Sequence, residues 1–268
     1  MDTSWKAQLE LTFAKQGEKT RLIKRKQLGP LTLQRPFYPD GKACHVYLLH
    51  PPGGIVGGDN LHISLHANEN SHTLITTPAA GKFYRSAGRQ ATQTVNIRVD
   101  NHAMLEWLPQ ETILYDGAKA SSTVNVALMP QAHFIGWEIL SLGRPASGEG
   151  FENGQAQMTW QISRDDRPLF LERLQLDAKA FWASWGLNGY CVCGTLFAVP
   201  VSPGNLEAVR DLIGDTAGRG VTQIDDMLIC RALDSRTDRL RVFFEQVWKI
   251  VRQDTLGHTF CIPRIWAT

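Results

Sequence analysis

Hydrophobic and polar residues alternate along the first two thirds of the chain, in short runs that turn residues separate. The alternation is clearest in residues 61–67, 94–99, 124–128 and 158–162. Because successive side chains of a strand point to opposite faces of a sheet, this period predicts half-buried β-strands. Many short strands without intervening helices predict an all-β sandwich, a barrel or a coil of sheets.

Two later segments repeat their apolar residues with the period of a helix. Ser202 and Pro203 are typical of a helix start, and Gly214 is typical of a helix end. Residues 240–251 carry a single apolar face, and Gly257 follows them. We therefore expect a single domain over residues 1–268, with a β body of about residues 1–200 and a helical C-terminal part of about 201–268.

Charge and hydropathy exclude several classes of protein. The chain has 28 Lys and Arg against 26 Asp and Glu, a formal net charge of +2 that is too small for a nucleic-acid-binding surface. No run approaches the roughly 18 apolar residues of a membrane helix, and residues 1–6 contain an early acid rather than a secretory signal. We expect a cytoplasmic protein that binds neither nucleic acid nor membrane, with its five cysteines as free thiols.

A basic cluster occupies residues 19–26. Charged residues on the edge of a sheet block unwanted strand pairing, so we expect a solvated strand or hairpin edge there. A binding patch for an acidic partner is the alternative.

The common catalytic and metal-binding motifs are missing. Residues 50–59 hold four glycines and two prolines, but neither Gly-Lys-Ser/Thr nor a helix follows, which disfavours a phosphate-binding loop. Cys191 and Cys193 lack a second pair of ligands, so we expect two small residues on one face of a strand rather than a zinc site. His62 and His66 share a strand face, as ordinary surface histidines or as a transient site for Ni, Zn or Cu.

Acidic residues inside apolar strands are a sharper signal. Glu106, Glu138 and Glu172 each stand in such a run. A buried carboxylate is costly without a partner, so each is expected to form a salt bridge, face water or line a polar cavity. Several together indicate an internal polar channel or a metal path. A pair of them as the acid and nucleophile of a carbohydrate-active β-protein is a second interpretation.

A set of short motifs occurs in one order along nearly the whole chain. They occupy residues 29–31, 34–39, 44–59, 74–78, 82–86, 105–111, 142–145, 172–176 and 263–266. The run Pro-Pro-Gly-Gly-Ile-Val-Gly-Gly-Asp at 51–59 is the most specific. With these motifs the chain resembles the UreD family of urease accessory proteins, called UreH in some organisms.

The resemblance implies a fold and a set of partners. The fold is mainly β, with stacked sheets in a β-helix-like arrangement and two α-helices in the C-terminal part. The implied function is that of a non-enzymatic urease maturation factor, a scaffold that binds apo-urease and a helical accessory protein of the UreF type. Through that protein it recruits a nickel-carrying GTPase of the UreG type.

The resemblance also implies that Ni²⁺ passes through an internal tunnel, with no tightly bound cofactor. The family's acidic path falls on Asp59, Glu138 and Glu172, which are the expected transient nickel ligands. Carboxylates and water hold an ion weakly enough to release it. Gly81 stands where some relatives carry a hydroxyl residue, so a hydroxyl side chain there is not essential. An assembly chaperone that handles no metal is the alternative function.

Overall fold

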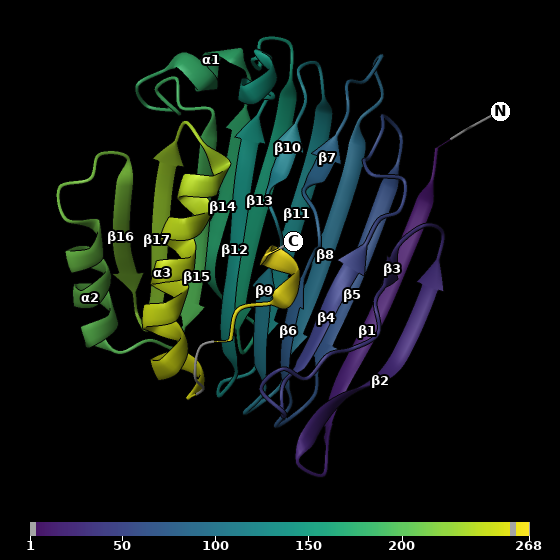
Figure 1. Ribbon diagram of the computed structural model, residues 1–268, viewed down its shortest axis with the longest axis vertical. Coiled ribbons are helices and arrows are strands. Elements are labelled where there is room, and N and C mark those ends of the chain that lie inside the picture. The colour runs from purple at the N-terminus through teal and green to yellow at the C-terminus, as the bar shows by residue number, and fades with distance from the viewer. Residues whose placement is uncertain (1–3, 258–260, 268) are drawn as a thin grey trace.

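Two β-sheets lie face to face in the computed structural model, which describes residues 4–257 and 261–267 (Figure 1). Residues 1–3, part of the N-terminal segment expected to lack a secretory signal, lie outside the described residues. The apolar faces of the two sheets meet in a continuous core, and a second apolar cluster lies between one sheet and the C-terminal helix. The outer face of the other sheet is open.

The first sheet has seven strands within residues 4–257. In spatial order they are β14 (Arg167–Leu176), β13 (Gln155–Arg164), β11 (Lys119–Leu128), β8 (Ala91–Val99), β5 (Asn60–Ala67), β1 (Lys6–Gln16) and β2 (Lys19–Leu28). The five central strands are parallel, and the edge strands β14 and β2 pair antiparallel to their neighbours.

In the part of the chain that the structure describes, the second sheet has ten strands, eight of them in one continuous row. In spatial order the row is β16 (Arg219–Ile224), β17 (Met227–Asp234), β15 (Val192–Val199), β12 (His133–Leu142), β9 (Met104–Leu108), β6 (His72–Thr76), β4 (Cys44–Leu49) and β3 (Thr32–Leu33). The short strand β10 (Thr112–Leu114) joins β12 to β7 (Gly81–Phe83) beside this row.

The chain alternates between the sheets, so that β5, β8, β11 and β13 lie in one and β6, β9 and β12 in the other. Each pass adds a parallel strand beside the previous one, as in a β-solenoid. Ile63, Val95, Val124 and Trp160 occupy one row across the first sheet, and all four side chains are buried. The stacked, β-helix-like arrangement is therefore confirmed. It arises because in-register repeats of apolar residues bury one face of every strand.

Among the described residues, three α-helices follow the solenoid: α1 (Ala178–Trp182), α2 (Pro203–Ile213) and α3 (Thr237–Leu256). Helices α2 and α3 confirm the two that the sequence predicts, and they end at Gly214 and Gly257. Helix α1 is too short to show a period, and the side chain of Asp177 caps it by accepting from the amide of Ala180. Strands β16 and β17 lie between α2 and α3, and the 3₁₀ turns are Pro145–Ser147 and Arg264–Ala267.

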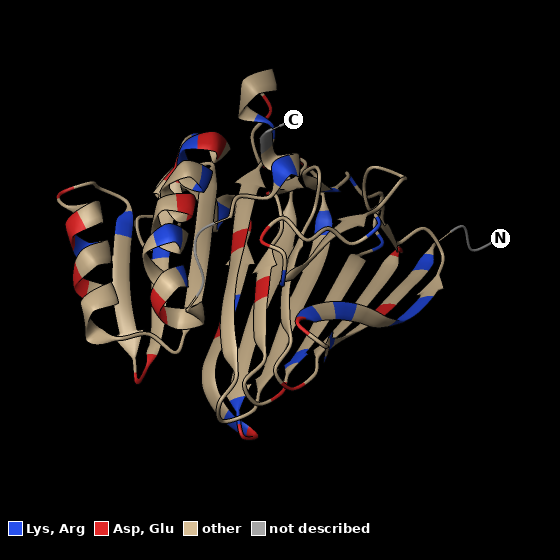
Figure 2. Ribbon diagram, turned by 60° about the horizontal axis from the view of Figure 1, so that its bottom comes forward, with Lys and Arg blue, Asp and Glu red and all other residues tan. Residues whose placement is uncertain are grey.

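The basic cluster of residues 19–26 lies on β2, the outermost strand of the seven-stranded sheet. Figure 2 shows these basic residues along the hairpin near the N-terminus. Lys24 and Lys26 both pair with Glu10 on β1, and their own side chains are mostly exposed. The prediction of a charged hairpin edge is confirmed.

The five cysteines are free thiols, as the sequence predicts. In the described part of the chain, no helix has the length and apolar character to cross a bilayer.

Candidate functional site

A cavity of about 250 Å³ lies between the two sheets, beneath the Gly-rich loop. Its walls come from that loop, from the segment before β7, and from inward-facing side chains of both sheets; they include Pro51, Gly53, Gly54, Lys82, Trp107, Glu138 and Trp160. Among the described residues that line it, Glu138 is the one carboxylate. A cavity with mixed walls and a single acid is the kind of place where an ion or water is held in an otherwise apolar core.

Glu138 reaches the cavity because of its place on β12. Its neighbours Trp137 and Ile139 face α3, so alternation turns Glu138 towards the space between the sheets. The pKa of its carboxyl is raised to about 7, chiefly by burial; the indole N–H of Trp160 lowers it, and the charge of Glu172 raises it. The group therefore changes charge near neutral pH.

Glu172 lies on β14, with its backbone opposite that of Trp160. Its carboxylate forms an ion pair with Arg231 of β17, at 2.5 Å between Oε1 and the guanidinium nitrogen. The ion pair joins the seven-stranded sheet to the ten-stranded one. Glu172 does not line the cavity, but it is near enough to Glu138 to affect its pKa.

Asp59 lies at the end of the Gly-rich loop, part of which lines the cavity. Its side chain is buried, and its two oxygens accept from the amides of Trp5, at 2.8 Å, and Val56, at 3.0 Å. Asp59 is not part of the cavity wall. His50 is part of it, and the charge of Asp59 affects the pKa of His50. Burial lowers the pKa of His50, and the charge of Asp59 partly offsets this effect. The structure thus brings Glu138 and Glu172 together and places Asp59 apart from them.

Glu106, the third acid in an apolar strand, has the salt bridge that sequence reasoning allowed for it. Its fully buried carboxylate accepts from His72, Trp248 and Arg252. It lies towards α3 rather than between the sheets, so its role is to attach the helix.

Gly81 lines the cavity at the start of β7. A Cβ atom built there would lie 3.5 Å from the hydroxyl of Thr112, which lines the same cavity from β10. Strand β10 therefore places the hydroxyl of Thr112 beside Gly81, which has no side chain of its own. Sequence reasoning did not single out Thr112, because the pairing of β7 with β10 is not visible in the sequence pattern.

The cysteine and histidine pairs do not form a metal centre. In the part of the chain that the structure describes, no three His, Cys, Asp or Glu side chains gather as a metal site would need. The thiol of Cys191 donates to the carbonyl of Ser235, and burial raises the pKa of Cys193. His66 contacts Asp100 at 2.8 Å, and His62 contacts Ser64 and Asn96.

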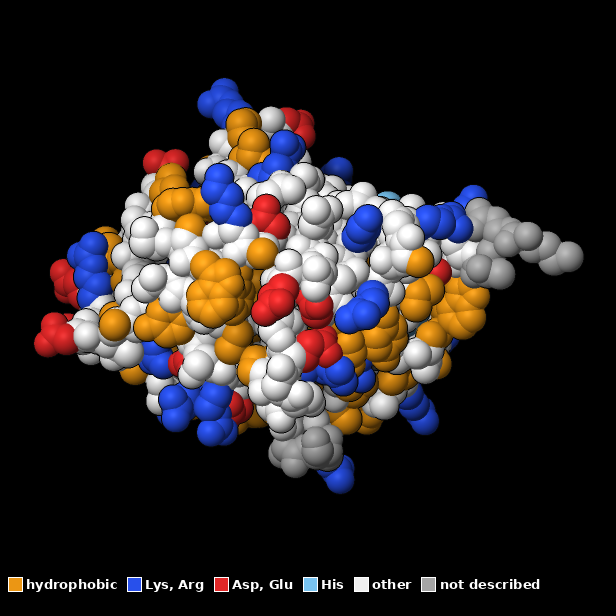
Figure 3. Space-filling model, turned by 90° about the horizontal axis from the view of Figure 1, so that it is seen from above, with side chains coloured by type: hydrophobic (Ala, Val, Ile, Leu, Met, Phe, Trp, Pro, Cys, Tyr) orange, Lys and Arg blue, Asp and Glu red, His pale blue; other side chains and the backbone are white. Residues whose placement is uncertain are grey.

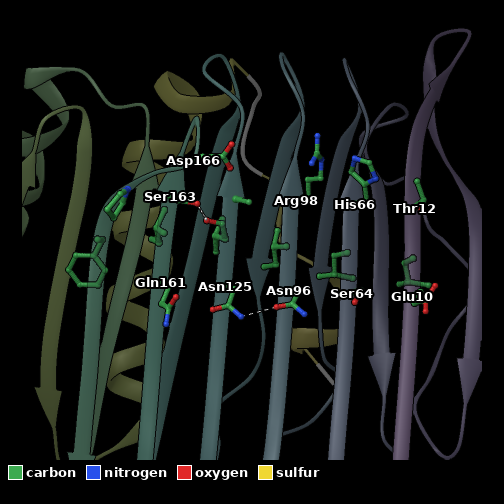
Figure 4. A pocket seen from close by; sticks show the side chains of 18 of the residues that line it. Glu10, Thr12, Ser64, His66, Asn96, Arg98, Asn125, Gln161, Ser163 and Asp166 are labelled. Carbon is green, nitrogen blue, oxygen red and sulfur yellow. Dashed lines mark hydrogen bonds between the residues drawn. The ribbon is translucent and has the colours of Figure 1, made fainter.

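A larger hollow, of about 710 Å³, lies on the open outer face of the seven-stranded sheet (Figure 4). A polar row crosses it, in which Asn125 donates to Asn96 and Asn96 donates to His62. Glu10 and Asp166 stand towards opposite sides of this hollow in Figure 4. Asp59, Glu138 and Glu172 do not line it.

The sequence matches a known family over nearly its whole length. The profile described as "UreD urease accessory protein" covers residues 6–267. Similar proteins include "Urease accessory protein UreD 2" of Brucella anthropi, 42% identical with all of both chains covered. "Urease accessory protein UreD" of Dechloromonas aromatica is 44% identical, over 99% of this chain and 95% of its own. A protein of that name in a Nostoc species is 42% identical, over 98% and 96% of the two chains. The chain therefore belongs to the UreD family of urease accessory proteins.

Proposed function

We propose that this protein is a non-enzymatic urease maturation factor that passes Ni²⁺ through the interlayer cavity towards apo-urease. Family membership supports a role in urease maturation. The observation that supports nickel transit is Glu138, a carboxyl with a pKa of about 7 in the wall of the cavity between the sheets. Recruitment of the UreF-type accessory protein, and of the UreG-type GTPase through it, belongs to the same proposal.

A carboxyl with this environment suits an ion in transit. Desolvation destabilises the charged form of the carboxyl. When a cation arrives and displaces the proton, its positive charge offsets the negative charge of the carboxylate. One carboxylate assisted by water holds a divalent ion more weakly than a cage of three or four ligands, which allows release. Ni²⁺ is cargo in this proposal, and no resident cofactor is required.

Asp59 and Glu172 have weaker claims as ligands, because both carboxylates already have partners. A cation that reaches Glu172 must compete with Arg231, and one that reaches Asp59 must compete with two backbone amides. We place Glu138 at the centre of the path and the other two acids as flanking groups.

The test is the nickel content of urease matured with the Glu138→Gln variant. Glutamine keeps the size of the side chain and removes the negative charge. We expect the variant to assemble with apo-urease and the accessory proteins, while urease nickel falls several-fold. Glu152→Gln, at an exposed loop position, is the matched control and is expected to leave nickel unchanged.

Two other outcomes would give different answers. Normal nickel delivery by Glu138→Gln would contradict transit past this residue and favour an assembly chaperone that handles no metal. Turnover of a glycoside that Glu138→Gln abolishes would favour the carbohydrate-active alternative, for which Glu138 and Glu172, whose charges interact, are the candidate pair of acids.

A further inference from the structure

The two edge strands of the seven-stranded sheet differ in their chemistry. Strand β2 carries the basic cluster of residues 19–26, which disfavours pairing with another strand. Strand β14, at the opposite edge, has the same length, but half of its residues are apolar: Leu169, Phe170, Leu171, Leu174 and Leu176. An edge strand presents backbone N–H and C=O groups that can pair with another chain. The charged side chains that protect β2 are therefore largely absent from β14.

The backbone of β14 is hydrogen-bonded on one side. Strand β13 pairs with it along nearly its whole length. In the part of the chain that the structure describes, no turn, loop or side chain forms a hydrogen bond with the backbone of residues 167–176 from the other side. Such unpaired main-chain groups are what β-strand addition uses, because they form the hydrogen bonds that hold an added strand.

The one inward-pointing charge of β14 is neutralised. A charged side chain that points into a sandwich can protect an edge strand from pairing, and Glu172 has this position. Its carboxylate, however, forms the 2.5 Å ion pair with Arg231 of β17. Phe170 and Leu174, on either side of Glu172, pack against the core between the sheets. The inward face of β14 therefore does not repel a neighbouring strand.

Leu171 and Arg173 alternate with these residues and face the open side of the sheet. The register places them opposite Gln161 and Thr159 of β13. Leu171 is 66% exposed, and Arg173 is also exposed. Among the described residues, none forms an ion pair or a hydrogen bond with the guanidinium of Arg173. A strand added beside β14 therefore meets an apolar side chain and, two residues further on, an unpaired positive charge.

The ten-stranded sheet extends further than β14 on this side. Glu172 of β14 pairs with Arg231 of β17, and β16 lies beyond β17 (Figure 1). Thr222 of β16 is opposite Ile229, whose side chain belongs to the core between the sheets, so Thr222 and Ile224 face the same side. Both are nevertheless exposed, Ile224 at 42%. A strand added to β14 would cover them.

A second copy of this chain does not fit this edge. Two copies joined through β14 into one continuous sheet would be related by a two-fold axis, with their β14 strands about 4.8 Å apart. Strand β17 lies beneath β14, and β16 extends past it. The β16 of one copy and the β17 of the other would therefore occupy the same space. An extended segment with no second sheet beneath it avoids this collision.

We propose that the free edge of β14 binds an extended segment of a partner protein as an added antiparallel strand. The segment has an acidic residue opposite Arg173, an apolar residue opposite Leu171, and apolar side chains over Thr222 and Ile224. Main-chain hydrogen bonds supply affinity in this mode of recognition, and alternate side chains supply specificity. The charge-assisted contact with Arg173 sets the register. This binding is independent of nickel transit.

Two exposed tryptophans that follow β14 provide a comparison. Trp182 and Trp185 are 67% and 70% exposed, and Figure 3 shows hydrophobic side chains gathered at this end of the molecule. The backbone there is paired within its own segment, because the amides of Gly186, Leu187 and Gly189 donate to carbonyls of residues 180–183. This segment has apolar surface without a free strand edge. Trp185→Ala is therefore the control for simple apolar adhesion.

The probe is the labelled peptide acetyl-Thr-Val-Glu-Val-Val-Val-Thr-amide, whose Glu lies opposite Arg173 in the antiparallel register. Fluorescence anisotropy measures its binding to the full-length protein. We expect saturable binding that Arg173→Glu and Leu171→Lys each weaken about tenfold or more, because they introduce a like charge or a charge beside an apolar residue. A peptide with Lys in place of Glu is expected to bind Arg173→Glu better than it binds the unaltered protein.

Two control variants complete this measurement. Trp185→Ala is expected to bind the Glu peptide normally. Ile23→Lys makes the same change as Leu171→Lys at a 46% exposed position of β2, and it is also expected to bind normally. Circular dichroism is expected to give unchanged unfolding temperatures for Leu171→Lys and Arg173→Glu, because both side chains are exposed. Absence of peptide binding by the unaltered protein, or equal binding by both β14 variants, would overturn the proposal.

Backbone methylation distinguishes strand addition from other contacts. In an added strand, alternate residues direct their N–H groups towards β14 and away from it. N-methylation of one alternate set in the peptide is therefore expected to abolish binding, and N-methylation of the other set is expected to preserve it. Equal binding of the two methylated peptides would show that main-chain pairing is not the mode of binding.

Hydrogen exchange locates the peptide. The bound peptide is expected to slow exchange of amides in residues 167–176 and to leave those of residues 19–28 unchanged. Protection of β2 instead of β14 would place the site at the wrong edge. Sedimentation of the unaltered protein is expected to show no association through β14. A dimer that Leu171→Lys converts to a monomer would mean that a second copy, and not a partner segment, occupies this edge.

Discussion

Arg252 of α3 donates to Glu106 of β9 across 146 positions of sequence, with 2.9 Å between Nε and Oε2, and neither side chain is exposed to solvent. A second guanidinium nitrogen reaches Oε1 at 3.0 Å, so the contact is bidentate. Trp248 and His72 complete the shell of the carboxylate. The C-terminal helix is thus attached to the ten-stranded sheet by a fully buried ion pair as well as by its apolar face.

Removing one charge of this pair is expected to be costly. In Glu106→Gln the guanidinium of Arg252 is left buried without its counter-charge, and breaking a buried pair in this way costs roughly 3–5 kcal/mol. Urea unfolding followed by circular dichroism measures the loss. The double variant Glu106→Leu with Arg252→Met is expected to recover part of it, because it leaves no unpaired charge. A single variant as stable as the unaltered protein would contradict this role of the ion pair.

The same network predicts that the free energy of unfolding depends on pH in the acidic range. Burial by itself would raise the pKa of Glu106, but the hydrogen bond from His72 and the charge of Arg252 lower it from 4.5 to about 2. A lowered carboxyl pKa contributes stability above the unfolded value, and that contribution is lost as pH falls from about 4.5 towards 2. The difference in unfolding free energy between the unaltered protein and Glu106→Gln is therefore expected to shrink across this range. A difference that stays constant would show that the charge of Glu106 is not the cause.

For Glu138 we expect the opposite change of stability with pH. Its pKa is raised to about 7, so the folded state holds the proton more tightly than the unfolded state does, and stability declines as pH rises from about 4.5 through 7. Glu138→Gln removes this penalty. We expect the variant to unfold at a higher temperature than the unaltered protein at pH 8, with the gap closing at pH 5. A lower unfolding temperature at pH 8 would mean that the charged carboxylate stabilises the fold.

Much of the architecture follows from the sequence pattern. The period of two in residues 61–67 and 124–128 coincides with β5 and β11, and the helical period of residues 240–251 coincides with the centre of α3. These predictions succeed because each depends on the local period with which buried residues recur along the chain. Helix α1 was missed because its five residues are too few to show a period.

The candidate site was less accessible to sequence reasoning. The pattern shows that Glu106, Glu138 and Glu172 stand in apolar strands, but not which face of the sheet each occupies or what lies opposite. Only the packing of α3 on one face and of the second sheet on the other gives Glu106 an arginine and Glu138 a cavity. One of the two partners of Asp59, the amide of Trp5, comes from just before β1, which nothing in the Gly-rich motif indicates.

Gly81 offers a last test of the cavity. Its backbone does not need positive φ, and a Cβ atom would make an ordinary 3.5 Å contact with the hydroxyl of Thr112. Gly81→Ser is therefore expected to change the unfolding free energy by no more than about 0.5 kcal/mol and to leave nickel delivery intact, because the new hydroxyl faces a cavity that already contains one. Gly143→Ser is the matched contrast, since Gly143 has a φ of +74° and its Cβ would collide with the backbone of Gly150. Calorimetry of both variants, with the nickel content of urease matured by the first, measures these effects. A Gly81→Ser protein that folds normally but delivers less nickel would show that free space in the cavity, rather than a hydroxyl, limits passage.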